Sequence, residues 1–126
     1  MIELKFRAWD PWYETMHENV QFGIYVDPDD MIPFEDVIQL NYKIMQYTGM
    51  VDKNGREMYQ GDIFKYNDKS YIVSWHKGCW IANLIDKSYY FALYDNAKKR
   101  NDKYYCNDYT VIGNIYKNQE LLEEKK

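Results

Sequence analysis

The chain has 126 residues and a formal net charge of −4, and 18% of its residues are aromatic, including 14 tyrosines. The length fits one domain, because two halves would each be too small to bury a stable core. The aromatic content excludes a disordered chain, and the acidic balance excludes a general polyanion binder, whose phosphate contacts need a basic surface. We therefore expect one soluble domain over residues 1–126.

The segment Met1–Lys5 carries an acid where a secretory signal needs a basic region, and no long apolar run follows it. No stretch of the sequence is long and apolar enough to cross a membrane. We therefore expect a protein of the cytoplasm that makes no membrane contact, with Cys79 and Cys106 both reduced.

The first part of the chain predicts short elements. Residues 2–9 alternate apolar and polar side chains, which predicts a half-buried strand with Ile2, Leu4, Phe6 and Ala8 on one face. The Asp10-Pro11 pair should end this strand. A second strand is expected over residues 20–26, before the turn at residues 27–30, and a short helix within residues 33–42.

The middle of the chain gives sharper signals. Residues 44–51, 57–59 and 63–66 read as strands, and Asp52-Lys53-Asn54-Gly55 predicts a turn in which Gly55 adopts a positive φ. Asp62 follows Gly61 at a bend. We expect its carboxylate to accept backbone N–H groups there rather than to act as a catalytic acid.

The next hairpin can be tested against its own sequence. A two-residue turn at Lys77-Gly78 places His76 opposite Cys79 and Trp75 opposite Trp80. The same register places Val73 opposite Ala82 and Tyr71 opposite Leu84, so apolar pairs share one face. It predicts that Trp75 and Trp80 lie in the core or cap its end.

The segment from Ser88 to Tyr94 is aromatic on both faces. Such a strand is buried twice, or buried once and covered by a partner subunit. We therefore expect a homo-oligomer, and the candidate interface residues are Tyr89, Tyr90, Phe91 and Tyr94.

The rest of the chain predicts a polar loop over residues 95–103, a strand over 104–112 and a last strand at Ile115-Tyr116. Asn118 should cap a short helix that begins at Gln119. Roughly seven or eight short strands separated by turns are typical of a small barrel or sandwich.

Three blocks of sequence carry more than local geometry. They are Phe6-Arg7-Ala8-Trp9-Asp10, then Gln46 through Gly61-Asp62-Ile63, and last Val111-Ile112-Gly113-Asn114-Ile115-Tyr116 with Asn118 and Glu120-Leu121-Leu122. In this order they resemble the YopX family of phage and prophage proteins. The resemblance implies an SH3-like β-barrel core after an extended N-terminal region, and a gene that acts inside a bacterial host. It implies no activity and no catalytic residues.

From these observations the expected fold is mainly β. Residues 1–43 form the N-terminal region, 44–117 the barrel core and 118–126 a short helix or tail.

Few residues of the sequence are candidates for catalysis or for metal binding. His76 and Cys79 flank one tight turn, but a structural zinc site takes further ligands, and His17 and Cys106 lie far away in sequence. The acids Asp27, Asp29 and Asp30 lack the regular spacing of a calcium loop and read as a solvated turn. We expect no catalytic residues, no metal and no cofactor, and hence no enzyme.

One segment has the composition of a nucleic-acid site. Cations beside aromatic rings are how single strands are held, and the residues concerned are Lys98, Lys99, Arg100, Lys103, Tyr104 and Tyr105. The competing interpretation is a charged loop between ordinary strand tyrosines, which the acidic total favours. The sequence thus predicts a non-enzymatic accessory protein that contacts itself and an unknown phage or host protein, with nucleic-acid binding as the alternative.

Overall fold

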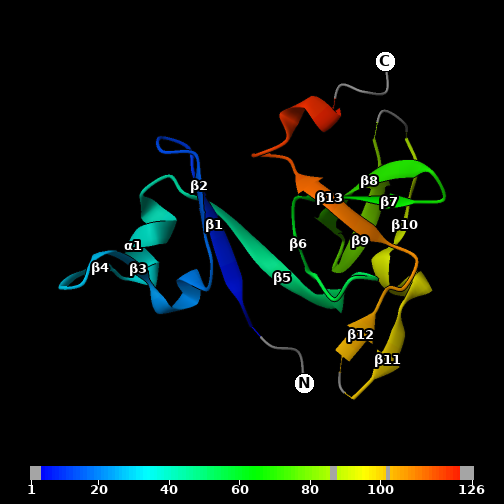
Figure 1. Cartoon of the computed structure of the whole chain (residues 1–126), viewed down its shortest axis with the longest axis horizontal. Helices are drawn as coiled ribbons and strands as arrows, with labels where there is room; N and C mark the ends of the chain where they lie inside the picture. The colour runs from blue at the N-terminus through cyan, green and yellow to red at the C-terminus, as the bar shows by residue number, and fades with distance from the viewer. Residues whose placement is uncertain (1–3, 86–87, 102, 123–126) are drawn as a thin grey trace. The chain divides into compact units, whose positions relative to one another are not determined.

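The computed structural model describes residues 4–85, 88–101 and 103–122 (Figure 1). The chain is mainly β, as predicted. It divides into two compact units, an N-terminal unit of Glu3–Tyr47 and a C-terminal unit that contains Thr48–Lys126. The strand β5 (Lys43–Val51) crosses this division, so its first residues belong to one unit and its last residues to the other. The boundary expected after residue 43 therefore falls at the start of a strand.

In the N-terminal unit, β1 (Phe6–Asp10) pairs antiparallel with β2 (Thr15–His17) on one side and with β5 on the other. Asp10 Oδ1 accepts the N–H groups of Trp12 at 2.8 Å and Tyr13 at 3.2 Å, which ends the strand as predicted. The predicted half-burial is wrong, because this central strand buries Arg7 and Trp9 as well as Ala8. Leu4 lies before the strand and is exposed, and Ile2 lies outside the described residues.

The strand expected over residues 20–26 is interrupted. The chain forms a 3-10 helix, η1 (Val20–Phe22), and then β3 (Ile24–Asp27), which pairs with β4 (Asp30–Ile32). Between them Gly23 adopts a φ of 94°, and a Cβ there would lie 2.7 Å from the carbonyl oxygen of Ile32. The predicted helix is present as α1 (Phe34–Gln39). The core of this unit is built from Ala8, Val20, Ile24 and Val37.

The C-terminal unit is built on a five-stranded antiparallel sheet in the order β10-β9-β8-β7-β13. These strands are β7 (Asp62–Tyr66), β8 (Lys69–His76), β9 (Cys79–Leu84), β10 (Tyr90–Ala92) and β13 (Thr110–Asn114). Within the described residues this sheet ends at β10 and β13 and does not close into a barrel. The strand β6 (Glu57–Tyr59) pairs instead with β5.

The turns of this unit form where they were predicted. Gly55 has a φ of 79°, and its N–H donates to the carbonyl of Asp52. Asp62 Oδ2 accepts the N–H of Tyr59 at 2.8 Å, which confirms the structural role expected for that acid. Asn67 and Asp68 both have positive φ, which closes the tight turn between β7 and β8.

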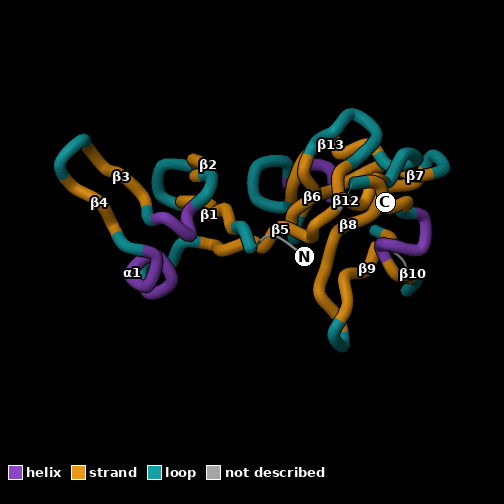
Figure 2. The backbone as a smooth tube through the Cα atoms, turned by 90° about the horizontal axis from the view of Figure 1, so that it is seen from below, coloured by secondary structure: helices purple, strands orange, loops and turns teal. Residues whose placement is uncertain are grey.

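The predicted register of the β8–β9 hairpin is confirmed for every pair, from Tyr71↔Leu84 to His76↔Cys79. Lys77 and Gly78 both have positive φ, as a two-residue turn of this type requires. The predicted burial of Trp75 is wrong, because 56% of its surface is exposed. Neither β7 nor β10 pairs with this end of the hairpin, and Figure 2 shows its turn extending beyond the neighbouring strands.

The segment expected to be a polar loop, residues 95–103, is largely ordered. It contains the last two residues of the 3-10 helix η2 (Leu93–Asn96) and the strand β11 (Lys98–Arg100), which pairs with β12 (Lys103–Tyr105). The strand expected over 104–112 is two strands, because β12 pairs parallel with β5 and a turn precedes β13.

The last predicted strand, at Ile115-Tyr116, is a turn. Here the side-chain oxygen of Asn118 accepts the N–H of Asn114 at 3.1 Å, so it bonds backwards along the chain. A 3-10 helix, η3 (Gln119–Leu122), follows, and the remainder of the expected terminal helix lies outside the described residues.

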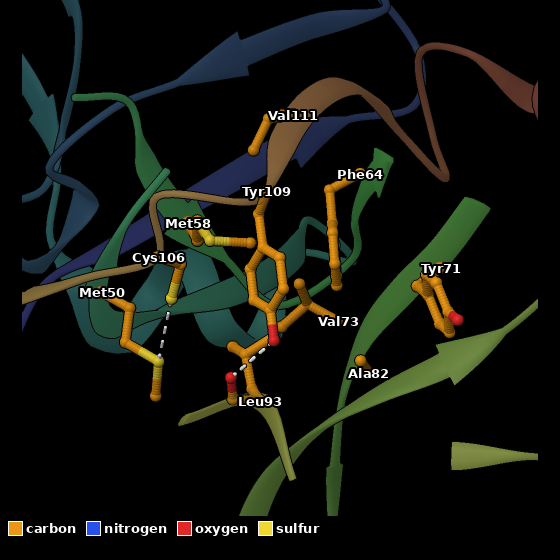
Figure 3. Close-up of a cluster of buried hydrophobic side chains, with 10 residues drawn as sticks. All are labelled: Met50, Met58, Phe64, Tyr71, Val73, Ala82, Leu93, Cys106, Tyr109 and Val111. Atoms are coloured by element: carbon orange, nitrogen blue, oxygen red, sulfur yellow. Dashed lines mark hydrogen bonds between the residues drawn. The ribbon is translucent and has the colours of Figure 1, made fainter. Parts of the chain in front are cut away.

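The core of the C-terminal unit surrounds Tyr109, which is fully buried (Figure 3). Its hydroxyl donates to the carbonyl of Leu93 at 2.9 Å, and its ring centroid lies 4.5 Å from that of Phe64. Cys106 packs in the same core, where burial, reinforced by Asp52 and Asp108, raises the pKa of its thiol to about 12. Its thiol is therefore protonated at neutral pH and suited to packing rather than to nucleophilic attack.

Candidate functional site

An open cleft of about 560 Å³ lies in the C-terminal unit, where the ends of β7, β8, β9 and β10 meet η2. Aromatic side chains from three different strands and polar side chains from two connecting segments line it. The lining residues are Tyr66, Asn67, Lys69, Tyr71, Leu84, Tyr89, Phe91, Asp95 and Asn96. A concave, mostly apolar surface with a few polar groups is the usual form of a binding site.

Three rings in mutual contact form one wall of this aromatic cleft. The ring centroid of Phe91 lies 5.2 Å from that of Tyr71 and 5.7 Å from that of Tyr66. Tyr66 in turn packs edge-on against the buried ring of Tyr109 at 5.2 Å. The ring contacts thus connect this wall of the cleft to the core.

Tyr89 differs from these three rings. It is 53% exposed and reaches Phe91 with a centroid distance of 6.2 Å. It therefore lies at the rim, where an incoming group would cover it.

The polar side chains at the cleft suit hydrogen bonding. Tyr66 donates its hydroxyl to Asn96 Oδ1 at 3.4 Å, while Asn96 Nδ2 donates to the hydroxyl of Tyr109 at 3.2 Å. Burial, with smaller contributions from Tyr89 and Tyr66, raises the pKa of Tyr71. Its hydroxyl therefore stays protonated at neutral pH and keeps a proton that it can donate to a ligand.

The four candidate interface residues do not form one surface. Tyr89 and Phe91 line the cleft together, because alternate residues of an extended segment point to the same face. Tyr90 points to the other face, where its ring packs against His76 at 5.1 Å. Tyr94 is exposed on η2 and is not part of the lining.

The six candidate nucleic-acid residues do come together, on the β11–β12 hairpin. Its register pairs Lys98 with Tyr105, Lys99 with Tyr104 and Arg100 with Lys103. One face therefore presents Lys98, Arg100, Lys103 and Tyr105.

The two tyrosines of this hairpin already have partners. Tyr104 packs against the core. The guanidinium of Arg100 lies 5.4 Å from the centre of the Tyr105 ring. The hairpin thus offers cations more readily than free ring faces.

Sequence reasoning missed the part of the cleft that the end of β7, the β7–β8 turn and the start of β8 supply. Tyr66, Asn67 and Lys69 carry no motif, and they join Tyr89 only because β10 pairs with β9. The other candidates stay apart. His76 and Cys79 face each other across their turn, and no group of side chains suited to a metal ion occurs in the described part of the chain.

Comparison with known families gives a clear result. The model of the YopX protein family matches residues 5–123, nearly the whole chain. The chain belongs to the YopX protein family. The match confirms the resemblance seen in the three sequence blocks, and it extends through the segment between residues 70 and 103, for which those blocks are silent.

This YopX chain is also similar to a solved structure, protein EF1440 from Enterococcus faecalis. The two share 28% sequence identity with a TM-score of 0.63, and the similarity covers 97% of this chain and 99% of the other. No protein with a curated description matches the sequence. Over the residues described, none of the helices has the length and apolar character needed to span a membrane.

Proposed function

We propose that this YopX protein is a non-enzymatic accessory protein of a phage or prophage that acts in the cytoplasm of a bacterial host. It works through protein–protein contacts, with a phage or host protein and with further copies of itself. The family resemblance supports the proposed phage origin, and it also supports the proposal that the five-stranded sheet is the core of an SH3-like barrel. The observation that carries the binding role is the aromatic cleft.

The chemistry of the cleft favours a polypeptide side chain as its ligand. Phe91, Tyr66 and Tyr71 offer an apolar wall, while the amide of Asn67 is suited to backbone groups. Aromatic anchors seated in such pockets dominate the affinity of protein interfaces. The strand β10 is also a sheet edge within the described residues, so an extended partner can lie beside it. We therefore propose that the cleft receives an aromatic or long apolar side chain of an extended segment.

Replacing Tyr89 with alanine tests this role. A library of displayed random peptides is selected for binding to the whole protein. The selection should enrich sequences that share one aromatic or long apolar anchor. Tyr89→Ala should weaken the binding of the selected peptides by about tenfold or more, because the bound side chain covers the exposed ring of Tyr89 and aromatic rings buried on binding contribute strongly to affinity.

The matched control is Tyr90→Ala. Tyr90 is exposed to almost the same extent, 52%, and is the next residue along the chain, at the start of β10 and on the opposite face. It should leave peptide affinity unchanged. Peptides that bind both variants as well as they bind the wild type would show that the cleft is not the site.

A second candidate function is supported by the β11–β12 hairpin, whose register gathers three cations on one face. Such a face can follow the phosphates of single-stranded nucleic acid. A protein with Lys98→Ala, Lys99→Ala and Arg100→Ala should then bind a labelled single-stranded DNA more weakly. Its affinity should also depend less steeply on the salt concentration. Absence of any DNA binding at low salt would dismiss this function.

A further inference from the structure

Two hairpins of the chain carry opposite charge. The β3–β4 hairpin presents Asp27, Asp29 and Asp30, all exposed. The β11–β12 hairpin presents Lys98, Lys99, Arg100 and Lys103, also all exposed. We call them the acidic hairpin and the basic hairpin.

Each hairpin ends in a cross-strand pair of like charge next to its turn. Asp27 lies opposite Asp30 in the acidic hairpin, and Arg100 lies opposite Lys103 in the basic hairpin. Like charges directly opposite each other destabilise a two-stranded ribbon. A surface of opposite charge bound to either hairpin relieves that repulsion. The two hairpins provide such surfaces for each other, because their charges are opposite.

The acidic hairpin also exposes apolar side chains. Its cross-strand pair Tyr25 and Met31 is 69% and 40% exposed, and Val26 beside it is 56% exposed. The neighbouring cross-strand pair, Ile24 and Ile32, packs into the core of its unit. One face of the hairpin is therefore used for folding, and the other offers an apolar area of the kind that marks interaction sites.

Both hairpins also have free strand edges. The β3–β4 pair forms a sheet of its own, and β11 is the last strand of its sheet, among the residues that the structure describes. An exposed edge is a template for pairing with another chain. Strand addition would place Lys98 and Arg100 beside the aspartates of the acidic hairpin.

We propose that the protein self-associates head to tail, with the basic hairpin of one copy docked on the acidic hairpin of the next. A second copy is the partner because the chain itself supplies both complementary surfaces. Such a contact uses two different patches, so a dimer joined by one contact leaves one hairpin of each sign unoccupied and can extend further. The hairpins are small, so the contact is weak and sensitive to salt.

This inference rests on the self-association included in the proposed function and names the surfaces that carry it. The test uses two charge-reversed proteins. One carries Asp27→Lys and Asp30→Lys, and the other carries Arg100→Glu and Lys103→Glu. Circular dichroism first checks that both are folded.

Sedimentation and light scattering at low salt then give the masses. The mass of the wild type should rise with concentration and fall towards that of a monomer on addition of salt. Each reversed protein alone should associate at least about tenfold more weakly. In the first, both hairpins are then positive, and in the second the two new glutamates cancel the charge of Lys98 and Lys99, so the basic hairpin no longer attracts the acidic one. An equimolar mixture should form a dimer of one copy of each, joined through the two unaltered hairpins.

A control protein with Glu18→Lys and Lys53→Glu changes the same kinds of charge at exposed positions outside both hairpins. It should associate as the wild type does. A wild type that stays monomeric at low salt, or a mixture of the reversed proteins that stays monomeric, overturns the inference.

Two further outcomes separate this inference from the proposed function. If Tyr89→Ala abolishes self-association while the charge reversals leave it intact, the aromatic cleft joins the copies and the hairpins do not. If the wild type is monomeric and Arg100→Glu abolishes DNA binding, the basic hairpin serves nucleic acid instead. Loss of peptide binding to the cleft has no effect on the expected behaviour of the mixture.

Discussion

Replacing Asp52 with alanine is expected to lower the free energy of unfolding by about 3–5 kcal/mol. The carboxylate is buried, with 1% of the residue exposed. Its Oδ1 accepts the N–H groups of Asn54 at 2.9 Å and Arg56 at 2.8 Å, and its Oδ2 accepts the N–H of Val111 at 2.9 Å. Alanine leaves these three donors without their acceptor. The bond from Val111 is buried and those from Asn54 and Arg56 are partly buried, and a buried donor left unpaired is costly. Urea unfolding followed by circular dichroism measures the loss.

Two variants show whether this loss has the stated cause. Asp52→Asn keeps one oxygen for the turn but presents an NH₂ group in place of the second, so it should lose mainly the bond to β13. Asp27→Ala removes an aspartate that accepts one N–H, from Asp29, at an exposed turn. That change should stay within about 0.5 kcal/mol. Equal losses for Asp27→Ala and Asp52→Ala would contradict the burial argument.

Asp52 illustrates what the sequence can predict. The turn at Asp52-Lys53-Asn54-Gly55 depends on residues adjacent in sequence, and the structure confirms it. The link to Val111 joins residues far apart in the chain, and no local pattern indicates it. The β8–β9 register was predictable for the same reason as the turn, since two positive-φ residues and the alternation of side chains determine it.

The exposure of Trp75 was not predictable from its hairpin. Its partner Trp80 and its face were assigned correctly, and the rings do pack together at 4.9 Å. Burial depends on whether a third strand lies beside that end of the hairpin, and β7 and β10 pair with other residues. The hydrophobic pattern of one hairpin carries no information about its neighbours.

The candidate site was predictable only in part. The aromatic run at Tyr89 and Phe91 was singled out from the sequence, and both residues line the cleft. Tyr66 and Tyr71 were read as ordinary strand residues, because their role depends on where β10 pairs. The basic hairpin was recognised as a cluster of cations, but its strands were not, since a run of charged residues resembles a loop.

Truncating Tyr109 should have the second large effect on stability. Tyr109→Ala removes a fully buried ring that contacts Phe64 and Tyr66, and we expect a loss of about 3–5 kcal/mol in the free energy of unfolding. Tyr109→Phe keeps the ring but removes the hydroxyl that donates to Leu93 and accepts from Asn96. Its expected cost at neutral pH is about 1–2 kcal/mol.

The pH dependence of this difference tests the role of the hydroxyl directly. Burial raises the pKa of Tyr109 above its ordinary value of 10.0, while the nearby Asn96 opposes the shift. Above that pH the unfolded chain loses the phenolic proton while the folded chain keeps it, so this contribution to stability is complete below pH 10 and declines as the pH rises. The advantage of the wild type over Tyr109→Phe should therefore shrink by up to about 1.4 kcal/mol for each pH unit above about pH 10. Urea unfolding of both proteins at a series of alkaline pH values measures it, and an advantage that stays constant would show that the hydroxyl ionises as freely in the folded protein as in the unfolded chain.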